Sequence, residues 1–438
     1  MFICLAFYPG YMSQDSLSQY QQAKNFSFLN ITPPVMSLVW HFTDKLIPGP
    51  LGMMVFHNLL FFSAVVLLIG THFSKSKFAF LLLPLVGLWP PIAVWLGTLW
   101  KDTSMFSAFL LAYAFILRAL KTRSNFVWFL SLLALLYASS VRHNALPAAL
   151  PFCYLLSRYW IRKRGLIQCF KRVTATILTV IGLFGFTKGV EKLLCSNTEF
   201  YLQQYLINFD LAGIVVRSHD PQLLNNMSEA YQRPLTFEWV SKLYEPWDHF
   251  KLATGDAELK LLDLPVIFKA TQNQKMEKLW FSAVITHPFA YLRHRIAVCS
   301  YLLGISAPAY YPYHPWGIDA NAYGFVKTNS YLNHKIMAFL RVCSKWPPFQ
   351  GFYYLIFIIY LLSLDLTVRA KLKRLPLNSS ALVWSGAIAF FCNSIMLPGA
   401  EFRYFSWTLV AGWVAILFYF FQQFFYRKTE LNKFYLSQ

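Results

Sequence analysis

Four short polar clusters carry the acids and bases of this chain that could act together in chemistry. They are SQDS with Asp15, LWKDTS with Lys101 and Asp102, VRHN with Arg142, His143 and Asn144, and GAEFRYF with Glu401, Arg403 and Tyr404. A carboxylate can accept the proton of an attacking hydroxyl, and cations can stabilise charge on a departing phosphate. If the clusters meet, the residue types predict a site for group transfer from a phosphate.

The chemistry of each side chain suggests its role in such a transfer. Asp15 is the candidate base, because it is an acid set among hydroxyl and amide side chains. Arg142 and Arg403 have forked guanidinium groups that suit phosphate oxygens, and Lys101 offers a point charge. His143 could donate a hydrogen bond to the same phosphate.

The composition places the chain among membrane proteins. Of its 438 residues 57% are hydrophobic, 18% aromatic and only 13% charged, which is too apolar for a soluble domain of this length. The formal net charge of +20 is spread over short basic clusters between apolar segments, as in loops that face anionic lipid. This pattern indicates contact with membrane lipid and argues against a nucleic-acid partner.

Apolar runs of about 20 residues are needed to cross roughly 30 Å of hydrocarbon. We therefore expect an all-α polytopic membrane protein with about nine or ten transmembrane helices. The apolar segments are 51–71, 78–97, 103–120, 125–141, 145–161, 173–193, 350–368, 380–398 and 405–426. Several contain proline, which a helix in lipid tolerates when its neighbours satisfy the freed backbone groups.

The first residues, MFICLAFY, are apolar but too short to span, and Pro9-Gly10 stops a helix after them. We expect them to be the outer end of a first, truncated helix that begins upstream; a short interfacial segment is the alternative. A secretory signal peptide is disfavoured because no basic residues precede the apolar run. The expected units are a transmembrane module at 1–193 with its first outer loop at 10–50, an outer, mainly helical domain at 194–349, and transmembrane helices at 350–438.

Lys and Arg gather in alternate loops. One set holds the basic clusters at 75–77, 118–123, 158–172, 369–374 and 427–433, whereas the other short loops hold only Lys101, Arg142 and Arg403. By the positive-inside rule the first set is cytoplasmic, so we expect a multi-pass protein of the cytoplasmic membrane with its carboxyl terminus inside. The four polar clusters then share the opposite, periplasmic face. Ionisable groups there usually point into the bundle or a water-filled cavity; interfacial anchors beside an aromatic belt are the alternative.

The two long outer regions differ in character. Residues 10–50 include VMSLVWHF, which predicts a short helix lying in the membrane interface. In 194–349 the run from 276 to 304 is amphipathic, and we expect it outside the membrane because a single crossing would invert every later loop. A pair of crossings before residue 350 is the alternative.

Other motifs with known chemistry are sparse. The sequence has no Gly-rich phosphate loop, no His-Glu-Xaa-Xaa-His and no nucleophile elbow. The absence of a nucleotide-binding signature argues against an ATP-driven transporter and against a cytosolic sugar-nucleotide enzyme. The outer-domain histidines are expected in ordinary hydrogen bonds, and the cysteines there allow at most one disulfide. These residues are His287, His294, His314, Cys195, Cys299 and Cys343.

The order of the motifs adds a resemblance. An apolar helix end is followed by YPGYMSQDSLSQYQQA, then TPPVMSLVW, then WKD at the mouth of one helix pair, RHNALP at the next and EFRYFSW before the last helix. This ordered set resembles multi-pass glycosyltransferases of the GT-C type, among them the bacterial enzymes that glycosylate O-antigen, lipid A or proteins outside the cytoplasm. The resemblance covers the membrane portion of the chain.

The resemblance implies an inverting transfer of a sugar from a polyprenyl-phosphate-linked donor to a glycan, lipid or protein acceptor. It also implies an acid near the reaction centre in the first outer loop, and Asp15 occupies that place. The donor phosphate would meet Lys101, Arg142, His143 and Arg403, and the sugar-binding or orienting residues would be Asp102, Asn144, Glu401 and Tyr404. Many relatives carry Asp-Xaa-Asp or Asp-Glu where this chain has a lone Asp15, so the need for a divalent cation stays open.

Two other classes remain. A flippase or secondary transporter for lipid-linked sugars would place ionisable residues near the membrane midplane on broken, repeated helices, whereas the sequence shows few such residues and no clear repeat. A polymerase or ligase of lipid-linked glycans would share the location and the donor lipid but would transfer a whole oligosaccharide.

Overall fold

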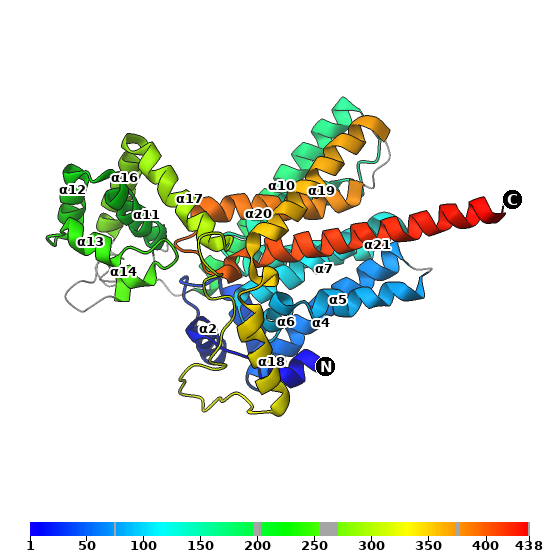
Figure 1. The fold of residues 1–438 in the computed structure, drawn as a ribbon, viewed down its shortest axis with the longest axis horizontal. Helices are drawn as coiled ribbons and strands as arrows, with labels where there is room; N and C mark the ends of the chain where they lie inside the picture. Colours follow the sequence, from blue (N-terminus) through cyan, green and yellow to red (C-terminus); the bar gives the residue numbers. More distant parts are fainter. Residues whose placement is uncertain are drawn as a thin grey trace.

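The computed structural model describes residues 1–73, 76–163, 165–195, 201, 203–254, 270–372 and 377–436. Within this part of the chain the secondary structure is helical, and the extended pairings are isolated bridges. The expected all-α class is therefore confirmed for the described residues. Figure 1 shows a bundle of long helices on one side and a smaller helical lobe on the other.

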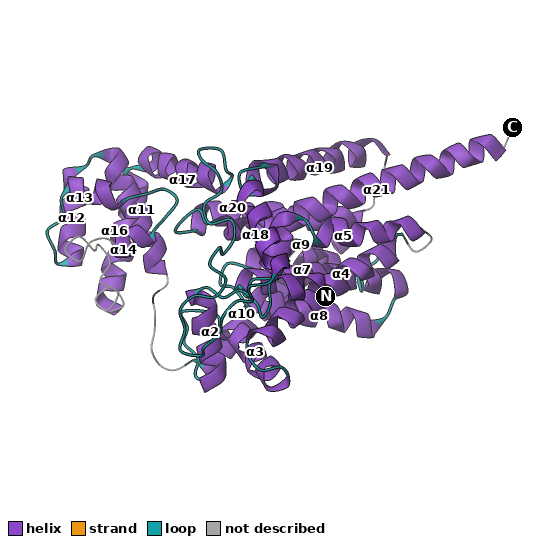
Figure 2. Ribbon diagram, turned by 60° about the horizontal axis from the view of Figure 1, so that its bottom comes forward, coloured by secondary structure: helices purple, strands orange, loops and turns teal. Residues whose placement is uncertain are grey.

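All the apolar segments expected to cross a membrane form helices. The bundle helices are α4 (Pro50–His72), α5 (Leu82–Gly87) after the 3-10 helix η1 (Lys77–Leu81), α6 (Pro90–Leu96), α7 (Lys101–Thr122), α8 (Asn125–Ser140), α9 (Leu146–Ser157), α10 (Leu166–Leu194), α19 (Gly351–Leu372), α20 (Leu377–Met396) and α21 (Ser406–Leu436) after η3 (Phe402–Phe405). Figure 2 shows that several of them, among them α4, α5, α19 and α21, run side by side.

Four of the described segments are long and apolar enough to cross a membrane on their own, namely α4, α7, α10 and Phe402–Phe424. A fifth is the pair Lys77–Gly87 and Pro90–Leu96, bent by 72° where the residue before Pro90 is disfavoured in a helix. With 16 and 12 residues, α8 and α9 fall short of the roughly 30 Å that a straight span must cover at about 1.5 Å per residue. The membrane class is supported, with fewer full-length spans than the sequence indicated.

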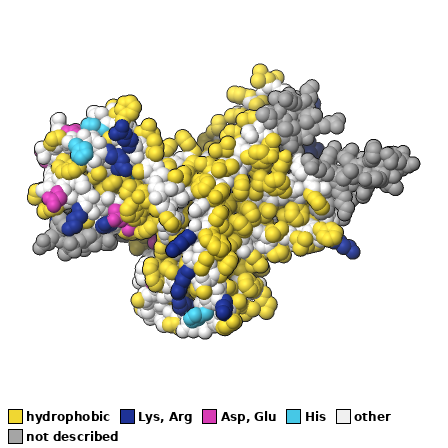
Figure 3. All heavy atoms as spheres, viewed as in Figure 1, with side chains coloured by type: hydrophobic (Ala, Val, Ile, Leu, Met, Phe, Trp, Pro, Cys, Tyr) yellow, Lys and Arg dark blue, Asp and Glu magenta, His cyan; other side chains and the backbone are white. Residues whose placement is uncertain are grey.

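α7 lies deep in the bundle and α10 at its edge. Small residues of α7, such as Ser104, Ser107, Ala108 and Ala112, are buried and let neighbouring helices approach closely. By contrast, α10 leaves most of its apolar side chains exposed. Figure 3 shows hydrophobic side chains over much of the visible bundle, while charged side chains of both signs gather on the lobe. This distribution is typical of a bundle in contact with lipid and a lobe in water.

The amino-terminal segment packs against the residues that lead into α7. After α1 (Phe2–Ala6), Tyr11 forms a bridge with Thr98. The ring of Phe7 lies against Gly97 so closely that no side chain fits there. The segment continues with α2 (Gln14–Asn25) and α3 (Pro34–Leu46), so the run VMSLVWHF is helical as expected.

The lobe is built from short helices. They are α11 (Gln203–Ser218), α12 (Pro221–Tyr231), α13 (Phe237–Leu243), α14 (Phe250–Thr254) and α16 (Ala270–Thr286). The amphipathic run breaks at His287 into α16 and α17 (Pro288–Leu302), and neither is a candidate span. In Figure 1, α17 leads from the lobe back to the bundle.

The remainder of the expected outer domain lies on the bundle rather than in the lobe. It includes α18 (Tyr331–Cys343) and η2 (Pro347–Phe349). Asn333 of α18 donates hydrogen bonds to Ala6 O and Tyr11 Oη, each at 2.7 Å. Residues that follow the lobe in the sequence therefore help to hold the amino-terminal segment.

Candidate functional site

Four helices begin at one end of the bundle, and the four polar clusters lie at these starts. Asp15 is in the first turn of α2, Lys101 and Asp102 are in the first turn of α7, Arg142 precedes α9, and Arg403 is in η3 before α21. The clusters are distant in sequence and adjacent in space. Helix N-termini carry partial positive charge, so this end of the bundle favours anions.

Two hydrogen bonds fix Asp15 beside the start of α7. Trp100 Nε1 donates to Ser13 Oγ at 3.0 Å, and Ser16 Oγ donates to Leu99 O at 2.8 Å. These four residues are buried, whereas the side chain of Asp15 is 41% exposed. Asp15 is therefore held rigidly at its backbone while its carboxylate stays within reach of a ligand.

Arg403 forms the centre of the site. Its Nη1 lies 2.9 Å from Asp15 Oδ2, and its Nε lies 2.5 Å from Glu401 Oε2. The guanidinium group stacks on Trp100 with its carbon 4.9 Å from the ring centroid, and Tyr404 Oη donates to Glu401 Oε1 at 3.2 Å. Because the side chains of Arg403 and Glu401 are each 8% exposed, water competes little for these charge-assisted bonds.

A second buried ion pair joins α7 to the loop before α9. Arg142 Nη1 contacts Asp102 Oδ1, and the two side chains are 8% and 2% exposed. The guanidinium carbon of Arg142 lies 4.7 Å from the ring centroid of Tyr404, and that of Arg403 lies 5.5 Å from the same centroid. Tyr404 thus connects both ion pairs. Together, the charged side chains that meet here form one charged cluster, which comprises Asp15, Lys101, Asp102, Arg142, Glu401 and Arg403.

The other residues expected at the site surround the charged cluster. His143 is exposed at its edge. Asn144 Nδ2 donates to Asn393 Oδ1 at 2.7 Å, and Asn393 Nδ2 donates to Tyr404 O at 2.8 Å. Asn144 therefore braces the backbone of Tyr404 through α20 and does not itself contact an ion pair. Sequence reasoning missed Asn393, although a lone amide in the apolar run FFCNSIM is a usable signal.

The charged cluster holds as many cations as carboxylates: Lys101, Arg142 and Arg403 against Asp15, Asp102 and Glu401. Partial burial opposes ionisation of Asp15, but the charges of Arg403 and Lys101 outweigh it and hold the pKa of this carboxyl below its usual range. Among the described residues, the Lys101 side chain makes no ion pair or hydrogen bond of its own. Asp15 is ionised at neutral pH, and an incoming anion would compete with it for Arg403.

The expected histidine roles are confirmed, since His287 and His294 form hydrogen bonds with aspartates and His314 Nδ1 forms one with Tyr311 Oη. The distances between the ring Nε2 and a carboxylate oxygen are 3.0 Å for His287–Asp220, 2.9 Å for His294–Asp210 and 3.2 Å for His314–Asp319. All seven cysteines are free thiols. In the described part of the chain no group of three or more His, Cys, Asp or Glu side chains could hold a metal ion.

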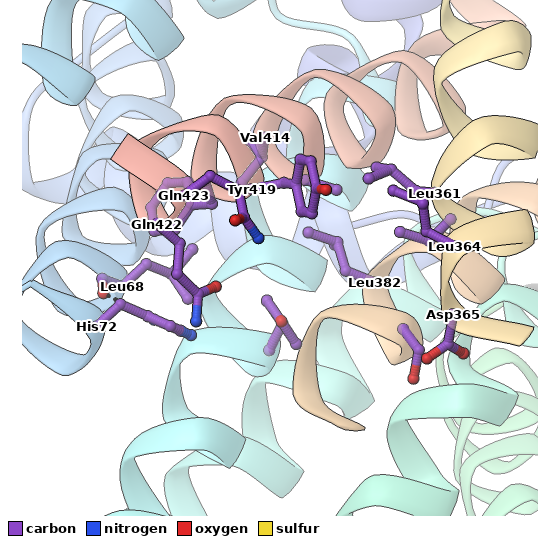
Figure 4. A pocket seen from close by; sticks show the side chains of 15 residues that line it. Leu68, His72, Leu361, Leu364, Asp365, Leu382, Val414, Tyr419, Gln422 and Gln423 are labelled. Carbon is purple, nitrogen blue, oxygen red and sulfur yellow. Dashed lines mark hydrogen bonds between the residues drawn. The ribbon is translucent and has the colours of Figure 1, made fainter. Parts of the chain in front are cut away.

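A groove lies away from the charged cluster, toward the opposite end of the bundle. Its cavity has a volume of about 100 Å³ and lies between α4, α7, α19, α20 and α21. In Figure 4, the polar side chains of His72, Asp365 and Gln422 line it among leucine and valine side chains. Ser380, near the start of α20, borders the groove. Asn393, near the end of α20, instead donates a hydrogen bond to the backbone of Tyr404 beside the charged cluster. The groove and the charged cluster share no residue.

Comparison of the chain with protein-family models, with curated proteins and with solved structures finds no match.

Proposed function

We propose that this chain is a membrane glycosyltransferase of the GT-C type. It transfers a sugar from a polyprenyl-phosphate-linked donor to a glycan, lipid or protein acceptor at the outer face of the cytoplasmic membrane, with inversion at the anomeric carbon. The observation that carries the proposal is the contact between Arg403 and Asp15. The guanidinium group of Arg403 and the accessible carboxylate of Asp15 lie side by side at the end of an apolar bundle. A phosphate with a membrane-embedded tail would lie at this position.

The cations would bind the donor phosphate. Arg403 contacts Asp15 directly and Lys101 acts on it through its charge, so a phosphate beside Asp15 would be within reach of both. Arg142 is committed to Asp102 and would chiefly hold Tyr404 in place. The phosphate gains charge as its bond to the sugar breaks, so cations fixed in advance stabilise the transition state more than the ground state.

Asp15 would take the proton of the acceptor. In the free protein its lowered pKa makes it a weak base. A donor phosphate bound at Arg403 would bring negative charge close and loosen the ion pair, and both changes raise the pKa of Asp15. The acceptor oxygen then bonds to the anomeric carbon, and the bond from that carbon to the phosphate oxygen breaks. The electron pair leaves with the polyprenyl phosphate, and the proton goes to Asp15.

The test uses purified protein in lipid vesicles with a radiolabelled polyprenyl-phosphate sugar and a glycan acceptor. The wild type should form labelled glycan, and Asp15→Asn should slow this transfer by about 10²–10⁴-fold with unchanged expression and membrane insertion. Glu229→Gln, on the exposed face of α12, is the control and should keep the wild-type rate. A wild-type rate in Asp15→Asn would remove Asp15 from the mechanism, and lack of product across a panel of polyprenyl-phosphate sugars would count against the transferase.

A carrier for lipid-linked sugars is the second candidate, and the groove beside Asp365 favours it. A carrier needs polar positions that open toward each side of the membrane in turn, and the charged cluster and the groove lie toward opposite ends of the bundle. Movement of the labelled lipid across the vesicle without covalent product would favour the carrier. Transfer of a preassembled oligosaccharide in preference to a single sugar would instead favour a ligase or polymerase.

A further inference from the structure

A second buried charge network occupies the lobe. Asp210 of α11 is fully buried. Trp280 Nε1 donates to its Oδ2 at 2.8 Å, His294 Nε2 donates to its Oδ1 at 2.9 Å, and Arg295 Nη2 contacts the same Oδ1. One carboxylate thus joins α11, α16 and α17, and a buried charge is tolerated only with such full pairing.

Tyr244 completes the hydrogen bonds of His294. Tyr244 Oη accepts a hydrogen bond from Arg217 Nη1 at 2.9 Å and donates to His294 Nδ1 at 2.7 Å. Burial lowers the pKa of His294 to about 4, so its ring is neutral and donates from Nε2 to Asp210. The lobe therefore needs nothing beyond its own residues to satisfy this histidine.

Arg295 also reaches out of the lobe. Its side chain is 6% exposed, and Nη1 donates a hydrogen bond to Leu397 O at 2.7 Å. Leu397 begins the segment 397–401, which connects the end of α20 to η3 and ends in Glu401. Arg295, on α17 between the lobe and the bundle, thus holds Leu397, the first residue of the segment whose last residue, Glu401, binds Arg403.

Further lobe contacts hold the same segment from Leu397 to Glu401. Ala400 N donates to Trp247 O at 3.1 Å. A Cβ at Gly399 would lie 3.3 Å from Trp247 O and 3.4 Å from His249 Nδ1, so the lobe leaves little room for this segment to move. Just beyond the segment, Phe402 N donates to Tyr310 O at 2.8 Å, and Tyr310 Oη donates in turn to Asp248 at 3.0 Å.

We propose that Arg295 is a positioning residue for the charged cluster. Anchored by Asp210, it fixes segment 397–401, which sets the position of Glu401 and through it the guanidinium group of Arg403. Binding of an anion at Arg403 and ordering of this segment are then coupled, and the coupling acts equally in both directions. The identity of the anion as a lipid phosphate rests on the proposed function, but the coupling between lobe and segment does not.

The first experiment measures hydrogen exchange of the backbone amides of residues 399–404 in the full-length protein. Arg295→Gln should speed exchange there by about ten-fold, the scale typical of coupling between linked sites, and Arg295→Lys should restore part of the protection. Arg293→Gln removes the same charge from an exposed position on α17 and should leave exchange unchanged. Wild-type exchange in Arg295→Gln would overturn the proposal.

The second experiment measures binding of polyprenyl phosphate by thermal protection. Arg295→Gln should weaken binding about ten-fold, and in the Arg295→Gln, Glu401→Gln double variant the two effects should not add, because one residue acts through the other. Additive effects would mean that Arg295 acts only on the stability of the lobe, and they would refute the claim that it positions Glu401 and Arg403. If the wild type does not bind polyprenyl phosphate, the proposed function fails while the exchange experiment still decides the coupling.

A second variant covers the case in which Arg295→Gln does not fold. Gly399→Ala crowds Trp247 O and His249 without touching Asp210, so it should loosen the same amides and weaken binding in the same direction. If Arg295→Gln does not fold and Gly399→Ala exchanges like the wild type, Arg295 is needed only for the stability of the lobe, and the proposal is overturned.

Discussion

Removing either partner of the Arg142–Asp102 pair should destabilise the protein strongly, and removing both should cost less than the sum of the two losses. The side chains are 8% and 2% exposed, so water cannot solvate the charge that is left behind. Loss of one partner of such a buried pair costs about 3–5 kcal/mol. Asp102→Asn leaves Arg142 against the Tyr404 ring without its carboxylate, and Arg142→Met leaves an unpaired carboxylate in the core. The double variant should lose less than the sum of the two, with a coupling energy of about 2–3 kcal/mol.

Equilibrium unfolding in mixed micelles with rising SDS, followed by tryptophan fluorescence, gives the free energies for this cycle. The Lys188–Glu191 pair supplies the control, because its nitrogen–oxygen distance is 2.8 Å but Lys188 is 52% exposed. Glu191→Gln should therefore change stability by less than about 1 kcal/mol. Additive losses in the cycle, or an Asp102→Asn variant as mild as Glu191→Gln, would refute the reasoning that the pair is buried and unsolvated.

Two further changes test other parts of the structure. Gly97→Ala should clash with the ring of Phe7 and lower the free energy of unfolding by about 1–3 kcal/mol. Adding Phe7→Leu to this variant should recover part of the lost melting temperature. An unchanged melting temperature in Gly97→Ala would contradict the close packing. The pKa of His294 falls to about 4 on folding, from about 6.5 in an unfolded chain, so the unfolded state takes up the proton first as the pH falls. The stability that this histidine contributes above about pH 6.5 should be lost progressively toward pH 4, and His294→Gln should show a shallower decline in melting temperature over that window. Equal slopes would show that His294 is not the group responsible.

The all-α class and the positions of several helices could be predicted because long apolar runs favour helices that bury their side chains. The expected segment 51–71 differs from α4 by a single residue at each end. The adjacency of the polar clusters also followed from topology, since the ends of alternate helices share one face. For example, Lys101 begins α7 and Arg142 follows the end of the next helix, α8, so both lie at the same end of this helix pair.

The choice of partners could not be predicted. Asp102 pairs with Arg142 and not with the adjacent Lys101, because side chains of consecutive helical residues point in different directions. The expected segment 78–97 breaks at Trp89, where the following proline disfavours helix. The pairing of Asp210 with Arg295 has no periodic signal, because both lie in a region with charges of both signs and only the tertiary fold selects among them.

Binding of polyprenyl phosphate to the wild type, Asp15→Asn and Arg403→Gln tests the charged cluster most directly. Asp15 competes with a phosphate for Arg403, so Asp15→Asn should bind about ten-fold more tightly by thermal protection, whereas Arg403→Gln should bind at least about ten-fold more weakly. Shifts of opposite sign are the predicted result. Equal affinity in all three proteins, or weaker binding in Asp15→Asn, would contradict the claim that one phosphate site contains both residues.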